Sequence, residues 1–237
     1  MEKKNQKKPR ILCLHGFRTS AEILKNLVHR WPEPVLGKLD LVFIDAPFPA
    51  QGKSNVEGIF NPPYYEWFQA NKDFTEFTKL EECLEYIEEF MIKNGPFDGL
   101  LGFSQGAVLS AALPGMQEAG VALTKVPKIK FVILISGSKF GGKWLGTPKL
   151  AAKAFSSPVM CPSLHFIGGE TDFVREDSLA LLDSFVDPVV INHRKGHTVP
   201  NLDEESMEIM LSFIEMIQKM LSGEEQKTRS TNPLSCL

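Results

Sequence analysis

Apolar residues gather into six short runs along the chain, separated by segments rich in polar and turn-forming residues. The runs lie within residues 10–16, 39–47, 97–104, 130–137, 162–169 and 188–193. Each is nearly continuous, as in "FVILI" at residues 131–135, instead of alternating between apolar and polar positions. Continuous runs of this length are typical of strands that are buried on both faces. The pattern therefore predicts six buried strands.

Helical spacing occupies several of the segments between these runs. In residues 80–95, apolar side chains recur every three or four positions, and the segment closes on Asn94-Gly95, a helix stop signal. Residues 107–116, 177–185 and 203–223 are the other segments that we interpret as helices. Strands that alternate with helices predict an α/β fold, with a mostly parallel central sheet and helices on both faces. Ligands of such sheets bind at the carboxyl ends of the strands.

The predicted elements define one domain, which we place at residues 10–222 of the 237-residue chain. Residues 1–9 form a basic segment and residues 223–237 a polar one, and we expect both to be disordered tails. Residues 45–75 follow the second strand and are dense in proline and aromatic residues. A long connection of this composition predicts an ordered insertion that forms a pocket wall or partial lid, with simple surface packing as the alternative.

Charge and composition exclude several function classes. A net charge of −3 and a pI near 6 leave no basic face for nucleic acid. No apolar run reaches membrane-spanning length, and the basic N-terminus lacks the apolar stretch of a signal peptide. The four cysteines include no C-x-x-C pair, and no N-x-S/T sequon occurs. We expect a cytoplasmic protein without a nucleic-acid partner or membrane span, and no pattern specifies an oligomeric state.

The third strand ends in a candidate nucleophile. The stretch "LLGFSQGA" contains the pattern G-x-S-x-G at Gly102, Ser104 and Gly106, between a predicted strand and a predicted helix. That setting is typical of a catalytic serine on a strained strand-to-helix turn. The turn presses the helix against the strand, so side chains at both glycine positions would collide with backbone. We interpret Ser104 as the nucleophile.

A serine hydroxyl needs a neighbouring base to remove its proton, and histidine is the usual one. Among five histidines, His197 follows the last predicted strand and precedes the final helix, so it lies at a carboxyl end of the sheet. His165 and His193 lie within predicted strands, and His29 lies on a surface helix. His15 is expected to shape the loop after the first strand by hydrogen bonding, with a second base as the alternative. We interpret His197 as the base.

The remaining catalytic groups come from loops at the same edge. Asp172 follows the fifth predicted strand and is our candidate acid, with Glu170 and Asp177 as competitors in the same region. The order serine, acid, histidine along the chain is that of α/β-hydrolases. An oxyanion hole requires two backbone N–H groups. We assign these to Gln105, which follows the serine, and to Phe17, which follows the first strand.

Four motifs in this order, "ILCLHGF", "FDGLLGFSQGA", "GETD" and "GHTVP", resemble the family of serine hydrolases, which has yeast, plant and human members. The resemblance covers about residues 9–221. It implies an α/β-hydrolase fold and esterase or thioesterase activity. It also implies that Ser104, Asp172 and His197 form the triad, with Phe17 and Gln105 at the oxyanion positions. One departure is Lys195 before Gly196, where a second glycine is expected in many members.

Aromatic residues near this edge suggest the wall of a substrate pocket. The candidate substrate-binding residues are Tyr64, Trp67 and Phe68 in the insertion, and Phe140 and Trp144 after the fourth strand. The tripeptide "GKS" at residues 52–54 does not fit a phosphate-binding loop, because no strand-to-helix turn surrounds it and the upstream glycine is missing. Since no metal-ligand cluster appears either, we expect neither a metal nor another cofactor.

Together these features predict a hydrolase that cleaves carboxylic esters with short-to-medium acyl chains through an acyl-enzyme. The same groups would cleave a thioester, so acyl-thioesterase is the nearest alternative. A hydrolase fold with weak turnover that serves as a small-molecule receptor is an alternative from a different class. In each case the partner is a small molecule.

Overall fold

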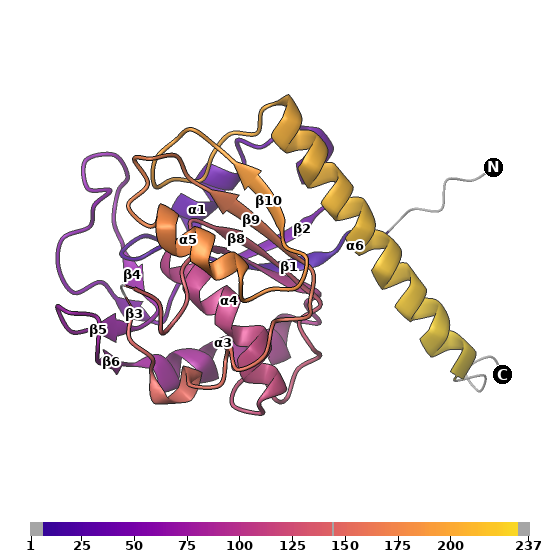
Figure 1. The fold of residues 1–237 in the computed structure, drawn as a ribbon, viewed down its shortest axis with the longest axis horizontal. Helices are drawn as coiled ribbons and strands as arrows, with labels where there is room; N and C mark the ends of the chain where they lie inside the picture. The colour runs from indigo at the N-terminus through magenta and orange to yellow at the C-terminus, as the bar shows by residue number, and fades with distance from the viewer. Residues whose placement is uncertain (1–6, 144, 232–237) are drawn as a thin grey trace.

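The computed structural model describes residues 7–143 and 145–231, with side chains through residue 223. Six parallel strands form the central sheet in the order β10-β9-β8-β7-β1-β2 (Figure 1). Their bounds are β1 Arg10–Leu14, β2 Asp40–Ile44, β7 Gly99–Phe103, β8 Phe131–Ile135, β9 Ser163–Ile167 and β10 Val189–Asn192. Each strand lies inside one of the six predicted runs, so the predicted parallel sheet is confirmed.

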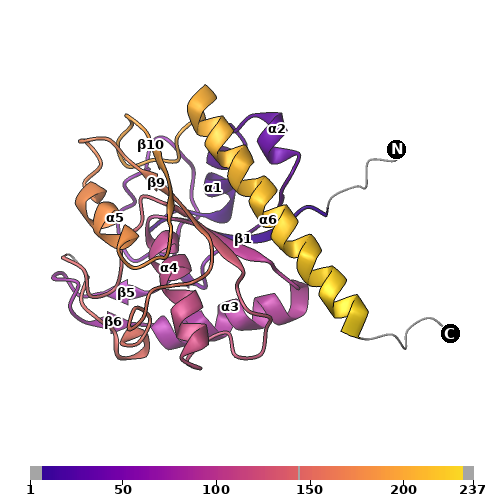
Figure 2. The same cartoon turned by 45° about the vertical axis from the view of Figure 1, so that its right-hand side comes forward.

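Helices cover both faces of the sheet, which explains why its strands are apolar throughout. One face carries α1 (Ala21–Val28), α2 (Glu33–Leu36) and α6 (Glu204–Thr231); the other carries α3 (Leu80–Asn94), α4 (Gln105–Glu118) and α5 (Arg175–Leu182) (Figure 2). A 3₁₀ turn, η1, spans Lys149–Ala151. Along β1, Ile11 and Cys13 pack into the first layer, whereas Leu12 and Leu14 pack into the second. Successive strand side chains thus supply two separate cores.

Three helix boundaries differ from the predicted ones. Helix α4 begins at Gln105, directly after Ser104, and α5 spans residues 175–182 instead of 177–185. Helix α6 continues past Gly223 to Thr231, into the segment that we expected to be disordered. A single glycine costs a helix only about 1 kcal/mol relative to alanine, so it does not by itself end one. Of the two expected tails, residues 1–6 and 232–237 lie outside the described residues.

Two small antiparallel ladders order the insertion at residues 45–75 and extend just beyond it. Strand β3 (Phe48–Pro49) pairs with β4 (Tyr65–Glu66), and β5 (Gln69–Ala70) pairs with β6 (Phe77–Thr78). Figure 1 shows these strands together at the left. The N–H of Tyr65 donates to the carbonyl of Thr19 at 2.7 Å, which joins the insertion to the loop after β1. Two-residue strands are too short to produce an alternating pattern, so sequence periodicity did not predict them.

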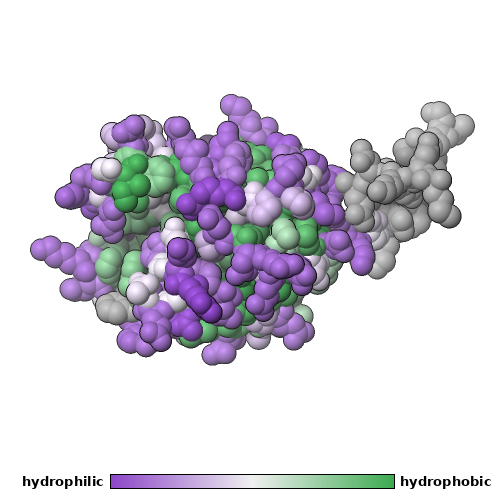
Figure 3. Space-filling view, turned by 90° about the horizontal axis from the view of Figure 1, so that it is seen from above, coloured by the Kyte–Doolittle hydropathy of each residue, from purple (hydrophilic) through white to green (hydrophobic). Residues whose placement is uncertain are grey.

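The surface in Figure 3 carries apolar areas that are broken up by hydrophilic side chains. Among the described residues, no helix has both the length and the apolar character needed to cross a membrane. Some large apolar side chains are nevertheless exposed, and two of them, Phe17 and Phe173, lie next to the candidate site.

Candidate active site

The site lies where the strand order changes direction. The chain places β2 on one side of β1 and then continues with β7 on the other side. The loops that follow β1 and β7 therefore diverge at the carboxyl edge of the sheet, which is where ligands bind in open α/β sheets. Phe17 follows β1, and Ser104 directly follows β7. The nucleophile and oxyanion candidates thus come from neighbouring strands.

Ser104 occupies a strained turn, as the glycine pattern predicted. Its φ and ψ are 53° and −116°, and its N–H donates to the carbonyl of Ile135 at 3.0 Å. Such values are costly for a residue that has a Cβ atom. A Cβ at Gly102 would lie 2.3 Å from the carbonyl oxygen of Gly106, and one at Gly106 would lie 2.1 Å from that of Leu14. Only glycine fits at either position.

Three of the predicted side chains form a hydrogen-bonded series. Ser104 Oγ lies 2.9 Å from His197 Nε2, and His197 Nδ1 lies 2.9 Å from Asp172 Oδ1. An ionised carboxylate accepts from Nδ1–H, which leaves Nε2 free to accept the serine proton. The two competing acids lie elsewhere: Glu170 is exposed, and the Asp177 carboxylate lies near Gly142 and Lys143.

Asp172 is buried, with 3% of its surface exposed, and three groups donate to it. Besides His197, Ser136 Oγ donates to Oδ2 at 2.6 Å and the Val174 N–H donates to Oδ1 at 3.1 Å. Burial acts to raise the pKa of Asp172, but the bonds from His197, Ser136 and Val174 outweigh it, so the net shift is downward. A Cβ at Gly168 would lie 2.3 Å from Oδ2, so this glycine leaves space for the carboxylate.

Sequence reasoning missed Ser136. This buried residue directly follows β8 and has a φ of 47°, in the left-handed region. Its place at the carboxyl end of the fourth strand, on the same edge as the other site residues, is the signal that could have identified it. The strained backbone directs the hydroxyl toward the carboxylate, so we interpret Ser136 as a positioning residue for Asp172.

Two phenylalanines lie against the imidazole of His197. The ring of Phe103 is 5.1 Å from it, and the ring of Phe173 is 4.3 Å from it, measured between centroids. Phe103 is buried at the end of β7, whereas Phe173 is 70% exposed. Sequence analysis did not select Phe173, because one aromatic residue in a loop carries no periodic signal.

The oxyanion candidates have free donors. No hydrogen bond within the described part of the chain uses the backbone N–H of Phe17 or of Gln105. The loop after β1, which carries Phe17, is held by His15, whose Nδ1 lies 2.8 Å from the Gly16 carbonyl oxygen and whose Nε2 accepts from the Ala46 N–H at 3.0 Å. Burial lowers the pKa of His15 to about 4, so its ring is neutral at pH 7. These bonds confirm that His15 shapes the loop, and they occupy both of its nitrogens.

The side chain of Gln105 holds the insertion next to the nucleophile. Its Oε1 accepts from the Trp67 N–H at 3.0 Å, and its Nε2 donates to the Phe68 carbonyl at 2.9 Å. Trp67 is completely buried, and its indole N–H donates to the carbonyl of His15 at 2.8 Å. Trp67 therefore stabilises the loop after β1 from inside the protein, and it presents no exposed surface to a pocket.

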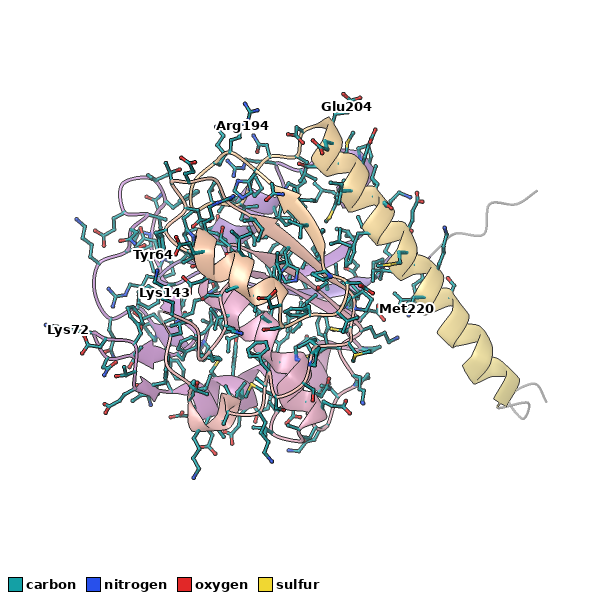
Figure 4. The ribbon with its side chains drawn as sticks, viewed as in Figure 1. Tyr64, Lys72, Lys143, Arg194, Glu204 and Met220 are labelled. Carbon is teal, nitrogen blue, oxygen red and sulfur yellow. The ribbon has the colours of Figure 1, made fainter. Side chains whose placement is uncertain are left out.

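The other aromatic candidates separate into distinct groups. The rings of Phe68, Phe77 and Phe140 contact one another, with centroid distances of 5.5 to 5.8 Å. Tyr64 is half-buried beside β4, and its hydroxyl donates to the Phe60 carbonyl at 2.6 Å (Figure 4). Trp144, also a predicted pocket residue, lies outside the described residues. Phe68 and Phe140 thus form an apolar cluster attached to Gln105.

The arrangement suits nucleophilic acyl transfer: a hydroxyl, an adjacent base, a carboxylate that orients the base, and N–H donors beside the hydroxyl. In the part of the chain that the structure describes, no group of three or more His, Cys, Asp or Glu side chains is placed to hold a metal ion.

Comparisons with known proteins place the chain in a family. The family model described as Serine hydrolase (FSH1) matches residues 1–209. Esterase OVCA2 of Bos taurus is 33% identical over 210 residues, which cover 81% of this chain and 89% of the bovine protein. Esterase CG5412 of Drosophila melanogaster is 32% identical over 230 residues, which cover 92% of this chain and 78% of the fly protein.

Solved structures share the fold at lower identity. The crystal structure of esterase PE8 matches with a TM-score of 0.57 at 21% identity and covers 89% of this chain and 93% of PE8. A Pyrobaculum calidifontis esterase matches with a TM-score of 0.53 at 14% identity, over 92% of this chain and 78% of that protein. At these identities the likeness establishes the α/β-hydrolase fold alone. With the family model spanning most of its length, this chain belongs to the serine hydrolase (FSH1) family.

Proposed function

We propose that the protein hydrolyses carboxylic esters through an acyl-enzyme, with Ser104 as nucleophile, His197 as general base and Asp172 as the orienting acid. The observation that carries this proposal is the hydrogen-bonded series of the three side chains, with the serine on a strained turn. Strain of this kind costs about 1–3 kcal/mol and persists where the surrounding structure maintains it. The names of the curated relatives, which are esterases, support the same reaction.

In the first half-reaction, Ser104 Oγ attacks the ester carbonyl while its proton passes to His197 Nε2. Negative charge develops on the carbonyl oxygen, and the N–H groups of Phe17 and Gln105 stabilise it. One such donor contributes a factor of about 10²–10³ in kcat. The C–O bond to the alcohol then breaks, and His197 returns the proton to the departing oxygen.

In the second half-reaction, water replaces the alcohol. His197 removes a proton from the water, whose oxygen attacks the acyl carbon, and the same two N–H groups stabilise the second tetrahedral intermediate. Ser104 leaves with the proton that His197 held, and the carboxylic acid is released. Asp172 remains ionised throughout and stabilises the imidazolium that forms in each half-reaction.

We place the acyl group on the side of the nucleophile where Phe68 and Phe140 lie. Both side chains are buried, and Phe68 is held next to the nucleophile by the Gln105 side chain. They therefore present little surface of their own, but the cluster that they form with Phe77 carries no charged group, which favours short-to-medium apolar acyl chains. A thioester with the same acyl group would use the same site, because the attacked carbonyl and the oxyanion are unchanged.

Steady-state kinetics on butyrate and hexanoate, each as an ester and as a thioester, test the proposal. Ser104→Ala should lower kcat/KM for esters by about 10⁴-fold or more, and His197→Ala by nearly as much. Asp172→Asn should also be severe, because the amide favours the wrong imidazole tautomer. His29→Ala changes an exposed histidine that directly follows α1 and should leave the rate unchanged. Retained hydrolysis in the serine or histidine variant would contradict the assignment.

A further inference from the structure

Phe173 is an exposed aromatic residue beside the proposed base. It directly follows Asp172 in the chain, and its ring lies 4.3 Å from that of His197. It is nevertheless 70% exposed, and His197 is its only ring partner among the described residues. A large aromatic side chain left in water forgoes the free energy that burial would provide. An exposed ring next to the catalytic base is therefore available to bind something apolar.

The proposed reaction determines what lies beside His197. To protonate the departing oxygen, Nε2 must come within about 3 Å of it. The alkyl or aryl group on that oxygen therefore lies along the edge of the imidazole. The acyl chain is bonded to the other side of the carbonyl carbon and extends toward the Phe68 and Phe140 cluster. Phe173, whose ring contacts that imidazole, is thus an exposed apolar surface on the side of the leaving group.

We propose that Phe173 is a specificity-determining residue that binds the apolar part of the ester's alcohol, so that the enzyme favours esters of longer or aromatic alcohols over methyl and ethyl esters. This inference rests on the proposed function, since it requires that His197 protonates the leaving group. It adds a second subsite to the acyl-binding cluster. The alternative is that Phe173 only holds the His197 ring in place.

The two roles differ in how the effect of a substitution depends on the alcohol. Butyrate esters of ethanol, butanol and hexanol share one acyl group, and their alcohols have similar acidity. They form the same acyl-enzyme, so differences in kcat/KM between them report the alcohol alone. Full burial of one methylene group of the alcohol would raise kcat/KM by a factor of about four. Contact on only one side of the alkyl chain would raise it about twofold per methylene. The wild-type kcat/KM should therefore rise about twofold per methylene.

Phe173→Ala should remove this dependence, with a loss of about 16-fold for the hexyl ester and little change for the ethyl ester. Phe173→Leu should retain about half of the dependence on chain length. Met160→Ala is the matched control: Met160 is 76% exposed but precedes β9, at the opposite edge of the sheet. It should leave all three rates unchanged.

An equal loss for all three esters in Phe173→Ala would overturn the inference and favour the ring-positioning role. An unchanged chain-length series in a folded variant would also overturn it. Failure of the proposed function has a different signature, because Ser104→Ala would then hydrolyse the same esters as fast as the wild type. Thermal unfolding of both Phe173 variants confirms that the comparison concerns folded protein.

Discussion

Replacement of Ser136 changes how the carboxylate of Asp172 is held. The Ser136 hydroxyl donates to Asp172 Oδ2 at 2.6 Å, and both residues are buried. In Ser136→Ala, Oδ2 loses this donor, and burial prevents bulk water from replacing it. A hydrogen bond to a charged group contributes about 1.5–3 kcal/mol. We therefore expect the free energy of unfolding to fall by about 2 kcal/mol.

The backbone of Ser136 gives a second variant with a different expected size. Its φ of 47° is strained for any residue with a Cβ atom and is relaxed for glycine. Ser136→Gly removes the same hydrogen bond but also this strain, so it should be about 1 kcal/mol more stable than Ser136→Ala. If Ser136 positions Asp172, both variants should lose activity to a similar extent. We expect kcat/KM to fall by about tenfold in each variant, which corresponds to about 1.4 kcal/mol of transition-state stabilisation.

Urea denaturation gives the stabilities, and hydrolysis of a butyrate ester gives kcat/KM. Ser138→Ala, two residues further along the same loop, is the control, because Ser138 is also buried but does not contact the Asp172 carboxylate through a hydrogen bond. It should change neither quantity by much. Wild-type stability together with wild-type activity in Ser136→Ala would refute the reasoning. An activity loss that glycine fully restores would assign the effect to the backbone instead of the hydroxyl.

Two further predictions concern packing and acid stability. Gly106→Ala places a Cβ 2.1 Å from the Leu14 carbonyl oxygen, so it should lower the free energy of unfolding by about 3 kcal/mol and abolish hydrolysis, as measured by urea denaturation and ester assay. Gly223→Ala, with no atom within 4 Å of the new Cβ, should be neutral or stabilising by up to about 1 kcal/mol; equal behaviour of the two variants would contradict the crowding argument. Burial lowers the pKa of both His15 and His165 to about 4, from 6.5 in the unfolded chain. Since the unfolded chain takes up these protons first, stability should fall as the pH drops from about 6.5 to about 4, by about 3 kcal/mol for each histidine. His165→Gln should reduce this decline by about 3 kcal/mol in denaturation curves recorded across that range, and an undiminished decline would show that His165 is not one of its causes.

The sheet and the central side chains were accessible to sequence reasoning because their signals are local. A continuous apolar run identifies a doubly buried strand, and the carboxyl ends of parallel strands lie at one edge. Ser104, Asp172 and His197 each follow a different strand, so the fold class alone predicted that they would be neighbours. The glycines around Ser104 added a steric signal, which the close approach of the Gly106 and Leu14 backbones explains.

The features that sequence reasoning missed depend on tertiary contacts. Ser136 acts through a carboxylate 36 positions away, and no local pattern marks that pairing. Phe173 resembles any loop phenylalanine until its ring is placed against His197. Trp67 was expected in a pocket wall because of its aromatic neighbours, but its indole N–H bonds inward to His15. The extension of α6 past Gly223 shows that one weak position does not set a helix end.

The most direct test of the proposed activity is covalent labelling of the purified protein with a fluorophosphonate probe, followed by mass spectrometry of its peptides. Such probes react with a serine only when a neighbouring base activates it. We predict a single adduct on Ser104 that is absent when His197 is replaced by alanine and present in His29→Ala. A folded protein that forms no adduct, or one that is labelled at another serine, would contradict the assignment of Ser104 and His197.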